Sequence, residues 1–174
     1  RWTQLSAEAQ GQTARLTRLA LMTAAALALH VAESWFPVAL PGVPGVKLGL
    51  ANSVTLLTML LIGPRDALAV AVLRVSLGSL LGGGAMGFAF SIAGALLSWA
   101  AMAGLRALFR EGIHTVSVSV AGALAHNAGQ LAVAVIFSGW YVFSYFPALL
   151  VSAVATGAAV GVCVGLVRRP LERA

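Results

Sequence analysis

The sequence predicts an all-α integral membrane protein with six transmembrane helices and with the N-terminus and the C-terminus both cytoplasmic. Of its 174 residues, 60% are hydrophobic and only 9% are charged, whereas about a quarter of the residues in a soluble domain are charged. The chain divides into six apolar segments, and its arginines collect on one side when these segments are threaded through a membrane. We expect a transmembrane domain over residues 16–167, a polar cytoplasmic segment over 1–15 and a basic cytoplasmic tail over 168–174.

The predicted helices are separated by prolines and glycines, which interrupt helices because proline lacks an amide hydrogen and glycine loses much backbone entropy. Three prolines between residues 37 and 44 end the first helix, Gly63 and Pro64 divide the second from the third, and glycines 82–84 divide the third from the fourth. The second and third are short, because a span takes roughly 20 apolar residues. The six helices are expected over residues 16–36, 48–62, 66–81, 86–109, 115–137 and 141–167.

The distribution of charge predicts the direction of these helices. With the N-terminus inside, nine arginines fall in cytoplasmic segments, Lys47 alone falls outside, and Arg74 lies within the third helix. Cytoplasmic loops of membrane proteins carry such an excess of basic residues. The net charge of +6 therefore indicates membrane topology, and we expect no nucleic-acid partner because the basic residues are scattered singly along the chain.

Small residues recur at every fourth position in the first and sixth helices. This spacing lets two helix backbones approach closely in lipid. In the sixth helix it favours packing inside the bundle. In the first helix Ala20, Ala24 and Ala28 are candidates for docking onto another membrane protein, with internal packing as the alternative. The two stripes are Ala20, Ala24, Ala28 and Ala32, and Gly157, Gly161 and Gly165.

Polar residues inside the predicted helices are the candidates for a binding site, because an ionisable side chain within a membrane is costly unless it faces a cavity or a partner. Arg74 lies eight residues into the third helix, and His126 and Gln130 share a face of the fifth. By depth these groups converge on the outer half of the membrane, which predicts a polar cavity open to the outside. We expect substrate binding by Lys47, Asn52, Arg74, His126, Asn127 and Gln130, with His30 and Glu33 at the cavity rim.

The two cations of this set, Arg74 and Lys47, suit an anionic group such as a carboxylate or a phosphate, which the amides and His126 would orient by hydrogen bonds. Structural interpretations remain open beside this one. Arg74 can pair with Glu33 as a buried ion pair, and Lys47 can extend to the membrane interface. The polar residues of the fifth helix can link helices by hydrogen bonds.

The sequence carries no catalytic constellation, so we expect that the protein is not an enzyme. Asp66 is the only aspartate, whereas a prenyl diphosphate synthase needs clustered aspartates to hold magnesium ions. The chain has no Walker-type GxxxxGK[ST] sequence, and its three histidines are scattered without close carboxylates. We expect no cofactor and no metal, and any ATP-driven function would need partner proteins.

Five strings hold most of the polar residues. They are "PGVPGVKLGLAN" (41–52), "GPRDAL" (63–68), "LRVSLGSLLGGG" (73–84), "SIAGALLSWAAM" (91–102) and "AGALAHNAGQL" (121–131). In this order they resemble the Gx transporter family, also labelled heptaprenyl diphosphate synthase component I, over about residues 18–167. The "KLGLAN" and "HNAGQ" portions are the most specific.

That family is similar to the substrate-binding S components of energy-coupling factor (ECF) vitamin transporters. The resemblance implies a bundle like that of an ECF S component, with six helices and a substrate site near the outer face. It also implies docking through small residues of the first helix onto a transmembrane coupling subunit, which two cytoplasmic ATPases drive. The signature polar positions of the family would be Lys47, Asn52, Arg74, His126, Asn127 and Gln130.

Two functions follow as hypotheses. The first is the substrate-binding subunit of an ECF-type importer in the cell membrane of a prokaryote, which captures a small anionic molecule that is isoprenoid- or quinone-related or vitamin-like. The second is a non-catalytic membrane accessory subunit of a prenyl diphosphate synthase or a quinone-biosynthesis system. That subunit would bind its partner through the cytoplasmic loops around Arg65 and residues 106–111. A purely structural membrane protein is the third interpretation.

Overall fold

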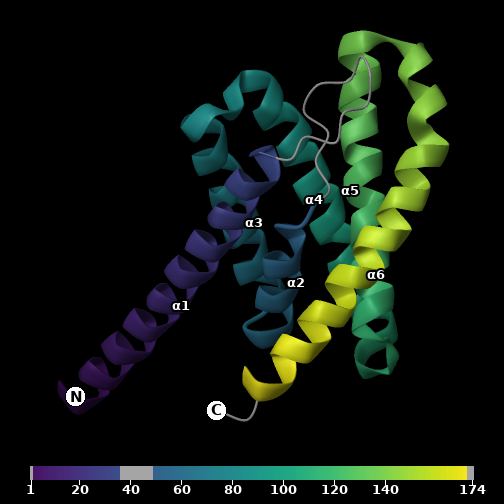
Figure 1. Cartoon of the computed structure of the whole chain (residues 1–174). Helices are drawn as coiled ribbons and strands as arrows, with labels where there is room; N and C mark the ends of the chain where they lie inside the picture. Colours follow the sequence, from purple (N-terminus) through teal and green to yellow (C-terminus); the bar gives the residue numbers. More distant parts are fainter. Residues whose placement is uncertain (1, 36–48, 172–174) are drawn as a thin grey trace.

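The computed structural model describes residues 2–35 and 49–171, and within them the chain is helical and forms no strand. Figure 1 shows the helices in order along the chain. Three short helical segments join some of them: a π-helical turn η1 (Ser79–Gly83), and 3₁₀ helices η2 (Arg110–Gly112) and η3 (Trp140–Tyr145). The α-helices are α1 (Trp2–Trp35), α2 (Asn52–Leu61), α3 (Pro64–Gly78), α4 (Gly84–Phe109), α5 (Thr115–Ser138) and α6 (Phe146–Leu171).

All six predicted apolar segments contain a helix, but several of the predicted bounds were wrong. α1 begins at Trp2 instead of residue 16, so the polar segment expected at the N-terminus continues the helix. α2 begins only at Asn52, after the left-handed Gly49 (φ 80°). The prolines expected to end the first helix lie outside the described residues. α6 extends to Leu171, past the predicted end at residue 167 and into the basic tail.

Four helical stretches of the described chain are long and apolar enough to cross a membrane, namely Gly11–Glu33, Gly84–Phe109, Thr115–Ser138 and Trp140–Leu171. At about 1.5 Å per residue, the 10 residues of α2 extend only about 15 Å. The hydrocarbon core of a bilayer is about 30 Å thick. The chain is therefore a multi-pass membrane protein in which α2, and to a lesser degree the 15-residue α3, are shorter than a full span.

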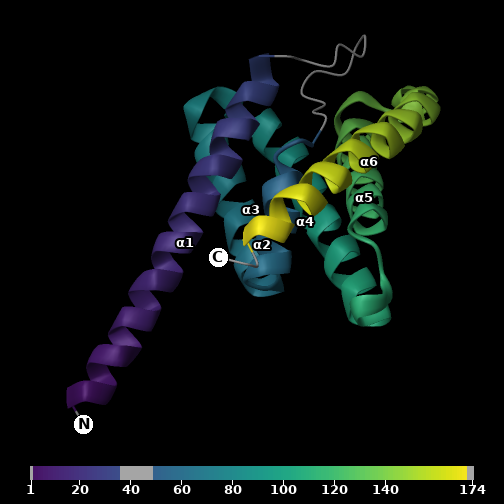
Figure 2. The same ribbon diagram turned by 60° about the horizontal axis from the view of Figure 1, so that its bottom comes forward.

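The helices form one bundle with α2, α3 and α4 between α1 on one side and α5 on the other (Figures 1 and 2). α1 packs on α3, α4 packs on α5, and α6 packs on α5 and crosses α2. The start of α1, the α2–α3 turn, the α4–α5 turn and the end of α6 all lie at the lower end in Figure 1. We call this the terminal end, and the opposite end, where η3 joins α5 to α6, the distal end.

Glycines set the spacing of the helices around α5. A methyl group added at Gly129 would lie 2.7 Å from the carbonyl oxygen of Ala93, so α4 and α5 touch through their backbones. On α6 a methyl group at Gly161 would lie 2.6 Å from the Cα of Val116. Gly165, the third member of the stripe predicted on the sixth helix, has no such neighbour within 4 Å. The stripe thus packs α5 against α6 over its first two members only.

Two α4 side chains hold the α2–α3 turn at the terminal end. The indole of Trp99 donates a hydrogen bond of 2.8 Å to the carbonyl of Pro64, and Nη1 of Arg106 donates one of 2.7 Å to the carbonyl of Met59. The last carbonyls of a helix lack intrahelical donors, and a cation satisfies them well. Arg106 therefore caps α2.

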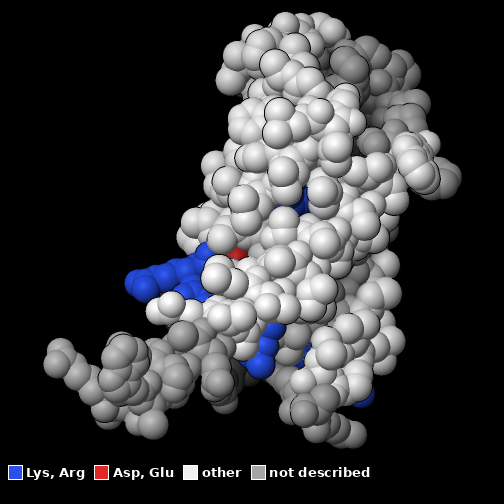
Figure 3. All heavy atoms as spheres, turned by 90° about the vertical axis from the view of Figure 1, so that its left-hand side faces the viewer, with Lys and Arg blue, Asp and Glu red and all other residues white. Residues whose placement is uncertain are grey.

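An ion pair joins α1 to α3. Arg15 on α1 lies 2.5 Å from Asp66 in the first turn of α3. The space-filling view of Figure 3 faces the side of the molecule on which α1 lies. There the blue side chains gather toward the terminal end, and the upper part is almost uniformly uncharged. On this face, the visible charged side chains of the described residues therefore lie mainly in the lower half.

Candidate functional site

The buried cation of the bundle is Arg74 of α3. It lies ten residues after Pro64, the first residue of α3, or about 15 Å along the helix. Only 2% of the residue is exposed. Its Nη2 donates a hydrogen bond of 3.3 Å to Oδ1 of Asn52, while its Nε has no hydrogen-bond partner among the described residues. A guanidinium carries five donors, so the site leaves part of this capacity available.

Glu33, from the end of α1, is buried beside this cation. Its opposite charge acts on Arg74. The same carboxylate accepts the backbone N–H of Leu50 at 2.5 Å and that of Ala51 at 3.5 Å. α2 has no cap from its own side chains, so a carboxylate from another helix takes that place. Glu33 thus joins α1 to the start of α2 and supplies negative charge to the buried cluster.

His126 of α5 packs against two glycines on other parts of the chain. A methyl group at Gly94 of α4 would lie 2.7 Å from its Nδ1, and one at Gly49 would lie 3.3 Å from its Cδ2 and 3.2 Å from Nδ2 of Asn52. His126 and Asn52 therefore flank Gly49 together. Gln130, one turn further along α5, is also buried, at 1% exposure.

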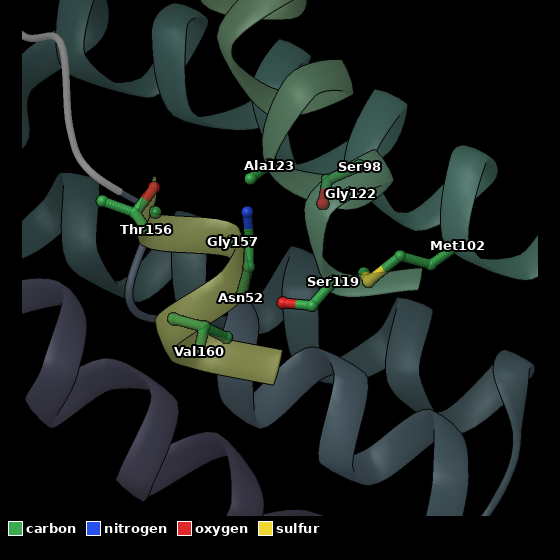
Figure 4. A pocket seen from close by; sticks show the side chains of 10 residues that line it. Asn52, Ser98, Met102, Ser119, Gly122, Ala123, Thr156, Gly157 and Val160 are labelled. Carbon is green, nitrogen blue, oxygen red and sulfur yellow. The ribbon is translucent and has the colours of Figure 1, made fainter. Parts of the chain in front are cut away.

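A small cavity opens beside Asn52, between α2, α4, α5 and α6 (Figure 4). Figure 4 shows the amide nitrogen of Asn52 directed toward Ala123 of α5. Nδ2 of Asn52 and Oγ of Ser98 are buried there and lack a hydrogen-bond partner among the described residues. The cavity, about 10 Å³, has room for about one water molecule. Its other polar lining residues are Ser119 and Thr156.

Other predicted site residues make different contacts or lie outside the described part of the chain. Asn127 donates a hydrogen bond of 2.9 Å to the carbonyl of Leu149 on α6, which is the kind of contact that links helices. His30 packs on Gly78 of α3. Lys47 lies outside the described residues. The docking candidates Ala20, Ala24 and Ala28 are exposed on α1.

The cluster that the structure does bring together consists of Glu33, Asn52, Arg74 and His126, and we call it the polar cluster. Four residues around it were missed from the sequence: Gly49, Gly94, Ser98 and Ser119. The two glycines stand in "KLGLAN" and "SIAGALL", where an isolated glycine in an apolar run is a signal of close packing. The two serines gave no comparable signal, because short hydroxyl residues are common in membrane helices.

Comparison with known proteins gives one family. A sequence model for heptaprenyl diphosphate synthase component I matches residues 22–167, which is most of the chain and includes the whole polar cluster. Neither the curated proteins nor the solved structures gave a match. The chain belongs to the heptaprenyl diphosphate synthase component I family.

Proposed function

We propose that the protein is the substrate-capture subunit of an ECF-type importer and that it binds a small anionic molecule at the polar cluster. The observation that carries this is Arg74, a buried cation whose Nε lacks a hydrogen-bond partner among the described residues. Burying a cation is costly in a membrane unless it binds something. An isoprenoid- or quinone-related or vitamin-like molecule would combine an anionic group for Arg74 with an apolar remainder for the surrounding helices.

The charge distribution supports six crossings with both termini in the cytoplasm of a prokaryotic cell. Arginines lie at the terminal end, on α1, at the α2–α3 and α4–α5 turns and on α6, as cytoplasmic ends require. Trp140 and Tyr141 of η3 are exposed at the distal end, and such rings favour a membrane interface. In this orientation η3 would face outward, and Arg74 would lie about 15 Å along α3 from the cytoplasmic end.

The polar cluster is closed in this structure, so capture would require the start of α2 to move. Glu33 holds the N–H groups of Leu50 and Ala51 and also balances the charge of Arg74. An incoming carboxylate or phosphate would compete with Glu33 for Arg74. Release of Glu33 would free the start of α2, which couples ligand binding to the position of that helix.

The outer surface of α1 supports a membrane partner. Ala20, Ala24 and Ala28 are exposed, whereas Thr23, Ala26 and His30 on the other face are buried in the bundle. An exposed stripe of small residues lets a second helix approach closely. The coupling subunit of the importer would dock there, and its cytoplasmic ATPases would supply the energy, because this chain is proposed to have no catalytic activity of its own.

The second candidate is a non-catalytic membrane subunit of a prenyl diphosphate synthase or quinone-biosynthesis system, and the name of the family favours it. The partner enzyme would bind at the terminal end, near Arg65 and residues 106–111. Co-purification distinguishes the two candidates. A coupling subunit with ATPases supports the importer, and a soluble prenyl synthase supports the accessory subunit.

The decisive experiment identifies the small molecules that co-purify with the protein in mild detergent. We would compare the wild type with Arg74→Gln and with Arg65→Gln, an exposed arginine of the same helix, α3. The proposal expects one anionic compound with the wild type and with Arg65→Gln but not with a folded Arg74→Gln. It fails if mass spectrometry finds no such compound in the wild type, or finds it equally in all three.

A further inference from the structure

A second polar feature lies at the terminal end, away from the polar cluster. It is a cavity of about 530 Å³ that we call the arginine pocket. This volume is within the usual range of ligand pockets, roughly 300–1,000 Å³. Its lining comes from the ends of α2, α4, α5 and α6 and from the turn between α4 and α5. The lining residues are Leu60, Arg106, Arg110, Ile113, Thr115, Val118 and Arg168.

Three guanidinium groups face this one space, and none of the described lining residues is acidic. Arg106 and Arg168 are close enough for their positive charges to repel one another. The described acidic side chains are elsewhere: Asp66 pairs with Arg15, and Glu33 lies in the polar cluster. Among the described side chains the pocket therefore concentrates positive charge, which favours an anion.

The backbone adds to this positive potential. α5 begins at Thr115, a lining residue, and its N-cap position His114 makes no side-chain cap hydrogen bond. The first N–H groups of a helix have no intrahelical acceptor and carry the positive end of the helix dipole. Anions such as phosphate bind well at such a helix end when cations are also present.

Arg110 occupies a backbone conformation that is uncommon for a non-glycine residue. Its φ is 49°, in the left-handed region that glycine favours, and it is the one non-glycine residue with positive φ in the described chain. An L-residue pays roughly 1–2 kcal/mol there. The turn thus places an arginine where a glycine would fit with less strain.

We propose that the arginine pocket binds the phosphate or diphosphate group of an amphiphile at the cytoplasmic end of the bundle. The guanidiniums and the start of α5 would hold the phosphate oxygens, which can be bound by two N–H groups of one arginine at once. Leu60, Ile113 and Val118 would contact the adjoining apolar part. This inference is independent of the importer, because the pocket shares no residue with the polar cluster.

Two sources can supply this group, an anionic phospholipid of the inner leaflet or a soluble phosphate ester, and one experiment separates them. Isothermal titration calorimetry would measure inorganic diphosphate binding to the full chain in mild detergent. Native mass spectrometry would count phosphatidylglycerol and phosphatidylcholine molecules retained from nanodiscs that contain both. Retention of phosphatidylglycerol without diphosphate binding indicates a lipid headgroup site, and diphosphate binding without retention indicates a soluble ligand.

Matched variants test the site itself. Arg168→Gln removes a lining cation, whereas Arg169→Gln removes the adjacent exposed cation that does not line the pocket. Arg110→Gly removes another guanidinium and relieves the left-handed backbone, so its fold is not expected to suffer. We expect Arg168→Gln and Arg110→Gly each to weaken binding about ten-fold and Arg169→Gln to leave it unchanged.

Two results would overturn the proposal. One is that neither diphosphate nor phosphatidylglycerol binds to the wild type. The other is that Arg168→Gln and Arg169→Gln reduce binding equally, which would make the arginines general topological charge. Arg74→Gln should retain phosphate binding at the arginine pocket even where it abolishes capture at the polar cluster, so the two proposals can fail separately.

Discussion

Arg74 and Asn52 are joined by a hydrogen bond of 3.3 Å between two side chains that are both buried. The bond links the last third of α3 to the first residue of α2. The other end of the Asn52 amide, Nδ2, faces the small cavity beside Ser98. Asn52 therefore connects the buried cation to the space between the helices, and the start of α2 is positioned by groups from α1 and α3.

Replacing Asn52 with leucine should destabilise the protein. Leucine has nearly the same size but offers no acceptor, so Nη2 of Arg74 would lose its partner. Leaving a buried polar group unsatisfied costs about 1–3 kcal/mol. Thermal unfolding in detergent should show a lower Tm for Asn52→Leu than for Ser53→Ala, its neighbour in the same helical turn. An unchanged Tm would mean that the hydrogen bond contributes nothing in solution.

Glu33→Gln should lower the free energy of unfolding by more than the loss of a helix cap alone would. Glutamine can still accept the N–H of Leu50, so the start of α2 retains an acceptor, but the negative charge beside Arg74 disappears. Removing one member of a buried charge pair costs about 3–5 kcal/mol. The double variant with Arg74→Gln should then be more stable than the sum of the two single losses predicts. The three variants form a double-mutant cycle, and unfolding measurements in detergent give the loss of stability in each. If the two single losses simply add up in the double variant, the two charges are not coupled.

Gly161→Ala and Gly165→Ala should behave oppositely, although both glycines belong to one stripe on α6. A methyl group at Gly161 would lie 2.6 Å from the Cα of Val116, whereas one at Gly165 meets nothing within 4 Å. Overpacking costs about 1–3 kcal/mol, and alanine is the better helix former by about 1 kcal/mol. We expect unfolding measurements to show Gly161→Ala destabilised and Gly165→Ala neutral or stabilised. Equal effects would contradict the α5–α6 contact.

The positions of the helices could be predicted from the sequence because apolar runs and glycine or proline interruptions are local signals. The predicted starts and ends of α4 and α5 agree with the structure to within two residues. The start of α1 could not be predicted in this way, because residues 2–15 are mostly polar. Hydropathy does not distinguish a polar helix from a loop. The stretch is rich in alanine and glutamine, which favour helix by propensity alone.

The polar cluster could be predicted in part. Burial of Arg74 follows from its place within an apolar helix, and Glu33 was a recognised partner for it. The bonds from Glu33 to the start of α2 depend on how α1 meets the segment after residue 48, which no local pattern encodes. His126 and Asn127 were assigned to the same site because they lie at nearly the same depth in the fifth helix. Successive helix positions are about 100° apart, and the structure turns Asn127 toward α6 instead.

Ala24→Leu tests whether the exposed face of α1 is a docking surface, with Ala26→Leu as its matched control. Ala24 is exposed, so a leucine there adds volume outside the bundle and should leave the Tm unchanged. Ala26 is fully buried, and a leucine there should lower the Tm by overpacking.

If a membrane partner docks on the stripe, Ala24→Leu should remain folded and yet lose that partner on co-purification, because a large side chain holds helix backbones apart. If instead Ala24→Leu retains every partner of the wild type, the α1 face is lipid-facing surface, and the partner would have to bind elsewhere on the bundle.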